Sequence, residues 1–220
     1  MILSTERIRQ LLESPPSDPA SRLVISPLLN ADKQLKPGQA SVDVRLGQRF
    51  YVPLRTKLSK LDRLSPDHQK DLQRYKDETF VPLGSHFVIH PGQFVLGETL
   101  EWIHLPANLT AYVVGKSTWG RDGLIIATAI GVHPNFSGIL TLEISNVGEI
   151  PIYLYPGFSI AQLFLSYVEL SDSAEAPVPS AFQMQTGPRG RNIDVEDRDI
   201  IEAFSKRADK RTKQDVSEVP

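Results

Sequence analysis

Short apolar runs separated by turn residues occupy the middle of the chain, from residue 79 to residue 169. The runs are rich in Val, Ile, Leu and aromatic side chains. Turns that contain Pro or Gly interrupt them at residues 90–92 (HPG), 146–148 (NVG) and 155–157 (YPG). Turns that recur about every 8–12 residues are typical of all-β sandwiches and barrels, because each strand there is short and each connection is tight. The pattern therefore predicts a mainly β domain with few helices.

Two other segments favour helices. Residues 3–14 place Ile8, Leu11 and Leu12 on one helical face, and a hydroxyl side chain at position 4 or 5 can cap that helix. The polar segment 65–77 starts with Ser-Pro and predicts a short exposed helix.

Apolar side chains recur at every second residue in the segment SVDVRLGQRFYV, which begins at residue 41. Apolar side chains there alternate with polar ones, and Asp43 and Arg45 fall on the polar side. This alternation predicts a half-buried strand whose polar side faces solvent.

The length of 220 residues is enough for one domain with a buried core. We expect residues 1–190 to form that single domain. The chain becomes polar after residue 169, so we expect residues 191–220 to form a helical or disordered tail.

Composition excludes several classes of function. The net charge of −2 argues against a chain that binds nucleic acid by electrostatics. The absence of cysteine rules out disulfides, thiolate nucleophiles and zinc sites with Cys ligands. No segment approaches the roughly 18 apolar residues of a membrane span, and the first residues carry charges where a signal peptide needs an apolar run. We therefore expect a cytoplasmic protein without a membrane partner.

The segment GKSTWGRDG, residues 115–123, begins like the end of a phosphate-binding P-loop. The pattern G-x-x-x-x-G-K-(S/T) would need a glycine at position 110, but Thr110 stands there. The preceding TAYVV predicts a strand, and Gly120 and Gly123 disfavour the long helix that follows a P-loop. We conclude that the segment is not a P-loop.

A hairpin turn with solvated charges is the default interpretation of an isolated G-K-S-T. Here, however, Lys116, Ser117, Thr118 and Arg121 lie within six residues at the end of an apolar strand. A lysine, two hydroxyls and an arginine suit a phosphate, because Arg adds fork-shaped hydrogen bonding to the charge of Lys.

The same segment resembles the dCTP deaminase family of the deoxyuridine triphosphatase-like superfamily, whose motif is G-(R/K)-S-(S/T)-x-(A/G)-R. Residues 115–121 match it at every defined position. The resemblance continues through ILSTERIRQLL, ASVDVRLGQRF, HPGQFVLGETLEWIHLP, TAIGVHPNFSGILTLEISNVGEIPIYLYPGFSIAQLFL and FQMQTGPRG. It implies a homotrimer of distorted β jelly-roll subunits, with active sites at the subunit interfaces.

The resemblance also implies roles for individual residues. Glu143, in the strand LTLEISN, would be the general base and proton shuttle, while Ser117 and Arg121 would position the water and the cytosine. The substrate-binding residues implied by the family pattern are Lys116 and Thr118 for the phosphates, Ala129 for the pyrimidine ring, His133 for the sugar and Gln185 for a C-terminal segment that closes over the triphosphate.

Hydrolytic deamination needs an activated water. Most cytidine deaminases obtain it from zinc held by His and Cys ligands, a route that a chain without cysteine lacks. We therefore expect no catalytic metal, and Mg²⁺ only together with the triphosphate. A buried carboxylate can take a proton near neutral pH, and alternation puts Glu143 on one face with Thr141 and Ser145. Without the family pattern, Glu143 would be interpreted as a surface glutamate.

The chain departs from the family pattern at several positions. In GVHPNFSG, His133 stands where the family has an aspartate that contacts the deoxyribose hydroxyl. In the triphosphatase cousins this aspartate is the base, so His133 weakens a diphosphatase more than a deaminase. The alternative to a sugar-binding role is that His133 is only a turn residue. A family arginine and histidine are replaced by Gly131 and Ile126, and a lysine and a tyrosine hydroxyl are absent near Gln185.

The leading hypothesis is hydrolytic deamination of dCTP to dUTP and ammonia, in pyrimidine deoxynucleotide metabolism. One alternative is a dUTP diphosphatase or a bifunctional enzyme that forms dUMP. Another is a catalytically silent trimer that binds nucleotides. The expected ligand is a deoxynucleoside triphosphate, dCTP first, with dUTP and dTTP as further candidates.

Overall fold

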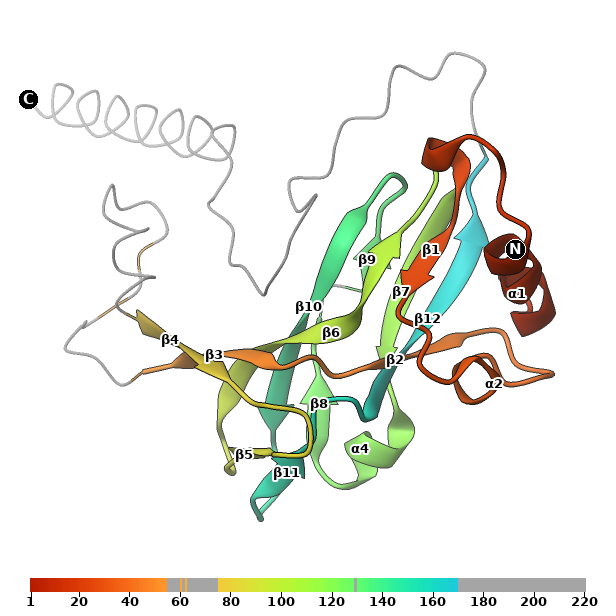
Figure 1. The fold of residues 1–220 in the computed structure, drawn as a ribbon. Coiled ribbons are helices and arrows are strands. Elements are labelled where there is room, and N and C mark those ends of the chain that lie inside the picture. Colours follow the sequence, from red (N-terminus) through yellow and green to blue (C-terminus); the bar gives the residue numbers. More distant parts are fainter. Residues whose placement is uncertain (55–59, 61, 63–74, 129, 170–220) are drawn as a thin grey trace, which may run out of the picture. The chain divides into compact units, whose positions relative to one another are not determined.

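The computed structural model describes residues 1–54, 60, 62, 75–128 and 130–169 (Figure 1). The chain divides into two compact units. One consists of Met1–Pro53 and Asp77–Arg189, and the other of Leu54–Lys76 and Gly190–Pro220. The domain boundary expected at residue 190 lies outside the described residues. So does most of the helix expected at 65–77, although its last two residues belong to a strand instead.

The helices in the described residues are short. They are α1 (Thr5–Glu13), the 3-10 helix η1 (Pro19–Ser21), α2 (Ala31–Gln34) and α4 (Ser117–Arg121). The strands are β1 (Val24–Ser26), β2 (Val42–Arg45), β3 (Arg49–Pro53), β4 (Lys76–Phe80), β5 (Phe87–Ile89), β6 (Phe94–His104), β7 (Leu109–Gly115), β8 (Leu124–Ile126), β9 (Gly131–Val132), β10 (Ser137–Asn146), β11 (Ile152–Leu154) and β12 (Ser159–Tyr167).

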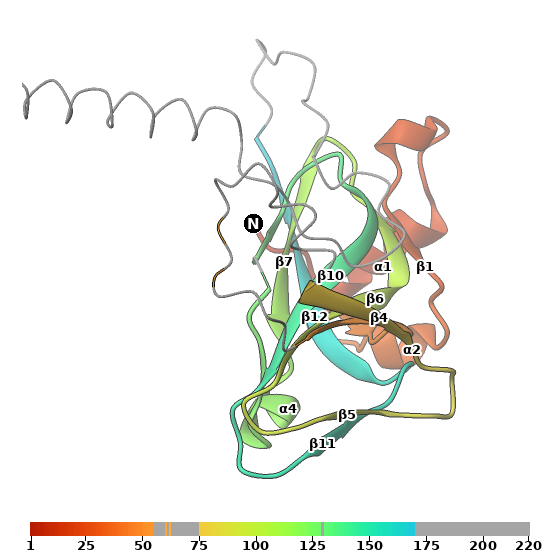
Figure 2. The same ribbon diagram turned by 90° about the vertical axis from the view of Figure 1, so that its left-hand side faces the viewer.

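The strands form three sheets. The largest has the order β4-β3-β6-β10-β8, with β1 also paired to β6. The second has the order β2-β12-β7-β9, and β11 pairs with β5 in the third. Figures 1 and 2 both place α4 and the β5–β11 pair at one end of the first unit. The prediction of a mainly β fold with few helices is confirmed.

One apolar core joins the two larger sheets. Ile103 of β6 and Leu142 of β10 belong to the same buried cluster as Val44 of β2 and Leu163 of β12. Burial of apolar area drives this packing, at roughly 25 cal/mol per Å² removed from water. The alternation of half-buried and buried residues along the whole of β10 follows from having the core on one side only.

The local predictions for the N-terminal helix and the turns are confirmed. Ser4 caps α1, since its side chain accepts a hydrogen bond from the Arg7 N–H, and Ile8 is buried. Gly92 and Gly157 have φ angles of 73° and 89°, which glycine adopts without the steric cost of a Cβ atom.

The prediction for β2 was wrong in one respect. The apolar side of the strand is buried as expected, but Asp43 on its polar side is also buried, with 4% exposure. The physical reason is that other side chains cover this side. Lys116, Lys36 and Gln162 all contact the Asp43 carboxylate and leave its side chain 6% exposed.

In the described part of the chain, no helix combines the length and the apolar character that crossing a membrane requires.

Candidate active site

The motif segment forms a strand, a sharp turn and one short helix. Strand β7 ends at Gly115, and the Lys116 N–H then donates to Ile160 O at 3.1 Å. Trp119 N and Gly120 N both donate to Lys116 O, which starts α4 at once. The helix is only five residues long, so the exclusion of a P-loop is confirmed.

The side chains of α4 divide into an anchor and an exposed set. Trp119 packs against the core, and its indole N–H donates to Ser159 O at 2.9 Å. Ser117, Thr118 and Arg121 are exposed. The helix therefore presents two hydroxyls and a guanidinium on its outer side, where a ligand can reach them.

Glu143 lies on β10, three residues before the end of the strand. It is half-buried and shares a face with Thr141 and Ser145, as the alternation predicted. Its backbone is held on one side by β6 and on the other by the segment after β8. The Glu143 N–H donates to the Thr128 hydroxyl at 2.9 Å, and the Ala127 N–H donates to Glu143 O at 2.8 Å.

The end of β10 is fastened to the end of α4. Asn146 pairs with Leu124, the first residue of β8, and the Val147 N–H donates to Gly123 O at 2.9 Å. Gly123 has a φ of +90°, and a Cβ atom there would lie 2.7 Å from the Gly148 Cα. Only glycine fits this close approach. The contact ties the segment after α4 to the end of β10, and α4 itself contacts β8, the strand that pairs with β10.

Of the remaining predicted residues, His133 lies away from α4. His133 is exposed in the turn before β10, where its carbonyl accepts a hydrogen bond from Phe136 N. That turn precedes Ser137, which pairs with His104, whereas the opposite end of β10 pairs with Leu124 directly after α4. Within one chain, His133 and α4 therefore lie at opposite ends of β10. Ala129 and Gln185 lie outside the described residues.

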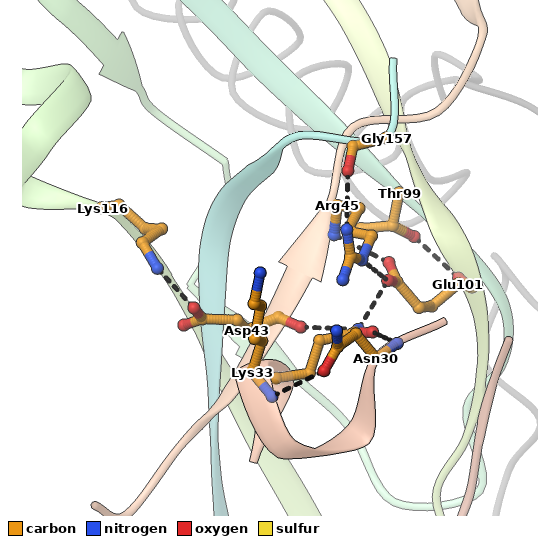
Figure 3. Close-up of polar contacts among 9 residues, drawn as sticks. Asn30, Lys33, Asp43, Arg45, Thr99, Glu101, Lys116 and Gly157 are labelled. Atoms are coloured by element: carbon orange, nitrogen blue, oxygen red, sulfur yellow. Dashed lines mark hydrogen bonds and ion pairs between the residues drawn. The ribbon is translucent and has the colours of Figure 1, made fainter. Parts of the chain in front are cut away.

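The Lys116 side chain is mostly buried, and a carboxylate holds its ammonium group. Its Nζ donates to Oδ2 of Asp43 at 2.5 Å, and the two side chains are 18% and 6% exposed (Figure 3). Burial by itself would raise the pKa of Asp43. The hydrogen bonds from Lys116 and Gln162 outweigh burial and hold that pKa below its usual range. Asp43 is therefore ionised at neutral pH.

A second buried carboxylate, Glu101 of β6, adjoins this pair (Figure 3). It accepts hydrogen bonds from Gln34 Nε2 at 2.9 Å and from the Arg45 N–H at 2.8 Å. Gln34 Nε2 also donates to the backbone carbonyl of Asp43 at 3.0 Å, which links the Glu101 carboxylate to the backbone of β2. Burial raises the pKa of Glu101 to about 7, against the opposing effect of these hydrogen bonds and of the Arg45 charge.

This buried network differs from what the sequence pattern predicts. Its members Asp43 and Arg45 were expected on a solvent-facing side, and Gln34 and Glu101 attracted no attention. The available signal was limited to the alternation of Asp43 with Arg45 along β2 and of Thr99 with Glu101 along β6. The described residues include no group of three or more His, Asp or Glu side chains arranged to hold a metal ion.

Comparisons with known proteins agree with the motif. A family model described as dCTP deaminase-like matches residues 2–168. A Natronomonas pharaonis protein named dCTP deaminase is 39% identical over 198 residues, which cover 88% of this chain and 95% of that relative. A Halobacterium salinarum protein named "dCTP deaminase, dUMP-forming" is 40% identical over 176 residues, 78% of this chain and 87% of that relative.

The fold has a solved counterpart. The crystal structure of 2′-deoxycytidine 5′-triphosphate deaminase from Agrobacterium tumefaciens matches with a TM-score of 0.54 and 26% sequence identity. The match covers 74% of this chain but 46% of that chain, so it spans less than half of the Agrobacterium protein. Because the family model spans most of the sequence and relatives align along most of their own length, the chain belongs to the dCTP deaminase-like family.

Proposed function

We propose that this protein hydrolyses dCTP to dUTP and ammonia. One observation carries the proposal: β8 pairs with the strand that carries the half-buried Glu143 and also contacts the helix that exposes Ser117, Thr118 and Arg121, in a chain of the dCTP deaminase-like family. A silent nucleotide-binding trimer would have no need for a carboxylate in that position.

Glu143 would act on the water. Its carboxylate takes a proton as the water oxygen bonds to C4 of the cytosine, and it then returns a proton to the amino group. The C4–N bond breaks and ammonia leaves. The proton that remains on the C4 hydroxyl moves to N3 of the ring, so that the C4 oxygen becomes the carbonyl of uracil. Ser117 and Arg121 would hold the water and the base in line, since charge-assisted hydrogen bonds add both direction and strength.

The triphosphate would lie against the turn at the start of α4. Thr118 offers a hydroxyl there, and the Lys116 ammonium has three N–H donors, of which Asp43 takes one. Ala129 would meet the pyrimidine ring through its backbone, and Gln185 would contribute from the C-terminal segment. A Mg²⁺ ion would arrive bound to the triphosphate, as part of the substrate.

The product separates two versions of this function. Relatives of this chain carry both names, dCTP deaminase and the dUMP-forming variant. We favour dUTP as the product, because a histidine at position 133 cannot supply the fixed negative charge of the aspartate that it replaces.

The test is to incubate the protein with dCTP and Mg²⁺ and to measure ammonia, dUTP, dUMP and pyrophosphate. Ammonia with dUTP supports the proposal. Ammonia with dUMP and pyrophosphate supports the bifunctional enzyme instead. Pyrophosphate released from dUTP at or above the rate of ammonia release from dCTP would replace the deaminase with a diphosphatase, and the absence of all products would favour a silent binding protein.

A homotrimer would bring the separated residues together. His133 and α4 lie at opposite ends of β10 within one chain, so a site that uses both needs two subunits. Light scattering in solution tests this part of the proposal, and a monomeric mass would contradict it.

We also propose that residues 1–190 suffice as the catalytic domain. The test is to delete residues 191–220 and to measure deamination, which should be retained.

A further inference from the structure

The partner of Lys116 is a buried carboxylate far away in the sequence. Asp43 lies on β2 and is 73 residues from Lys116, yet the two side chains form an ion pair at 2.5 Å. We propose that Asp43 is a positioning residue, which holds Lys116 and the start of α4 in the geometry that binds the triphosphate. This inference rests on the proposed function.

The position of Asp43 is itself defined from several sides. Strand β2 pairs with β12, where Gln162 lies directly opposite Asp43 and its Nε2 donates to Oδ1 at 2.9 Å. The backbone carbonyl of Asp43 accepts from Gln34 Nε2. The second carboxylate oxygen meets Lys116 and, at 3.5 Å, Lys36. A carboxylate fixed in this way is a rigid reference point for the ammonium group that it binds.

The bond to Asp43 completes the anchoring of Lys116. The Lys116 N–H already donates to Ile160 O, and its carbonyl accepts the N–H groups of Trp119 and Gly120. The long lysine side chain is otherwise flexible, and ordering it on binding would weaken affinity. With its Nζ held by Asp43 before the substrate arrives, the ammonium and the adjoining turn meet the phosphates without that penalty.

Lys36 provides a matched control. It contacts the same Asp43 oxygen as Lys116, but its side chain is 46% exposed, and it precedes β2 in the sequence and does not belong to the motif. If Asp43 served only to neutralise nearby positive charge, the two lysines would be equivalent. If Asp43 positions Lys116, only the bond to Lys116 affects nucleotide binding.

The test is Asp43→Asn, which keeps the size of the side chain. The asparagine oxygen can face Lys116 while its NH₂ group faces a flipped Gln162 amide, so we expect the variant to fold. We expect KM for dCTP to rise about tenfold and kcat to change less than about threefold. The dissociation constant for inorganic tripolyphosphate, measured by calorimetry, should rise by a similar factor. Lys36→Gln should stay within about twofold in all three quantities.

Unchanged KM and unchanged tripolyphosphate affinity in folded Asp43→Asn would overturn the inference, and so would an equal effect of Lys36→Gln. If the wild-type protein proves not to deaminate dCTP while Asp43→Asn still weakens tripolyphosphate binding, the proposed function fails and the role of Asp43 stands. If Asp43→Asn does not fold, Gln162→Met loosens the carboxylate without removing its charge. We then expect a rise of about threefold in the tripolyphosphate dissociation constant, and no rise would refute the role.

Discussion

The candidate site and the buried polar network differ in whether their charged side chains have partners inside the protein. The candidate site comprises α4 and Glu143 of β10, and the network comprises Asp43, Glu101 and the groups that bond to them. In the network, Asp43 and Glu101 accept hydrogen bonds from Lys116, Gln162, Gln34 and the Arg45 N–H. At the candidate site, Ser117, Arg121 and Glu143 form no side-chain hydrogen bond or ion pair with one another in the described part of the chain.

This difference follows from burial. A buried charge must find partners inside the protein, because leaving it unpaired costs several kcal/mol, on the order of 3–5 when one partner is removed. Exposed side chains exchange water for substrate at little cost. We therefore expect changes at the site to alter activity with little effect on stability, and changes in the network to alter stability and its pH dependence.

The largest expected effect is at Glu143. Glu143→Gln should fold and bind nucleotide but lose deamination by at least about 10³-fold, because an amide cannot take the proton from water. Steady-state ammonia release and the melting temperature measure the two halves of this prediction. The control is Glu149→Gln, an exposed glutamate just after β10, which should change neither. Activity of Glu143→Gln within tenfold of wild type would remove Glu143 from its role.

Because its carboxylates are buried, the network should make the free energy of unfolding depend on pH. The pKa of Glu101 rises from 4.5 to about 7 on folding, so the folded state binds its proton more tightly than the unfolded state. The resulting stabilisation is complete below pH 4.5 and is lost as the pH rises to about 7. Its full size is on the order of 3 kcal/mol. Glu98, whose pKa burial also raises, acts in the same direction.

Denaturant unfolding between pH 4.5 and pH 8 measures this dependence. Glu101→Gln should flatten the decline of the unfolding free energy with pH and leave only the part due to Glu98. An unchanged slope in Glu101→Gln would show that Glu101 titrates alike in the folded and unfolded states. Asp43, whose pKa is lowered, does not interfere, because its stabilisation is lost only as the pH falls below its usual range.

Arg121 should have the next largest effect. Arg121→Ala removes charge-assisted hydrogen bonds of roughly 1.5–3 kcal/mol, so kcat/KM for dCTP should fall about 10- to 150-fold. Because Arg121 is exposed, the melting temperature should stay unchanged. Arg121→Lys keeps the charge but lacks the planar guanidinium group, so its kcat/KM should lie between those of the wild type and Arg121→Ala. An Arg121→Ala variant with normal kcat/KM would place the site elsewhere.

The smallest expected effect is at His133. His133→Ala should raise KM for dCTP by a factor that corresponds to about 1 kcal/mol, because one hydrogen bond to the sugar is lost. We expect kcat to stay unchanged. The matched control is His90→Ala, another exposed histidine that precedes a proline in a turn. Equal KM values for the two variants would make His133 a turn residue only. His133→Asp should leave deamination intact, and its pyrophosphate release from dUTP tests whether the lost aspartate charge limits diphosphatase activity.

Much of the fold could be predicted from the sequence. The turns around Gly92 and Gly157, the capped helix α1 and the alternation along β10 all depend on neighbours within a few residues, and all are confirmed. The site residues of the motif could be named as well, because Lys116 to Arg121 form one contiguous pattern. Their roles stay predictions, since they depend on a substrate and on a second subunit.

The sequence by itself determined which residues alternate, where the chain turns and which motif it carries, because these properties arise from local geometry. Only the tertiary structure decided what covers each face. Asp43 was correctly assigned to the polar side of its strand, yet that side faces Lys116 and Gln162 instead of water. Alternation shows that two side chains point the same way, but it carries no information about which distant segment packs against them. For that reason the partner of Lys116, 73 residues away in the chain, could be found only in the structure.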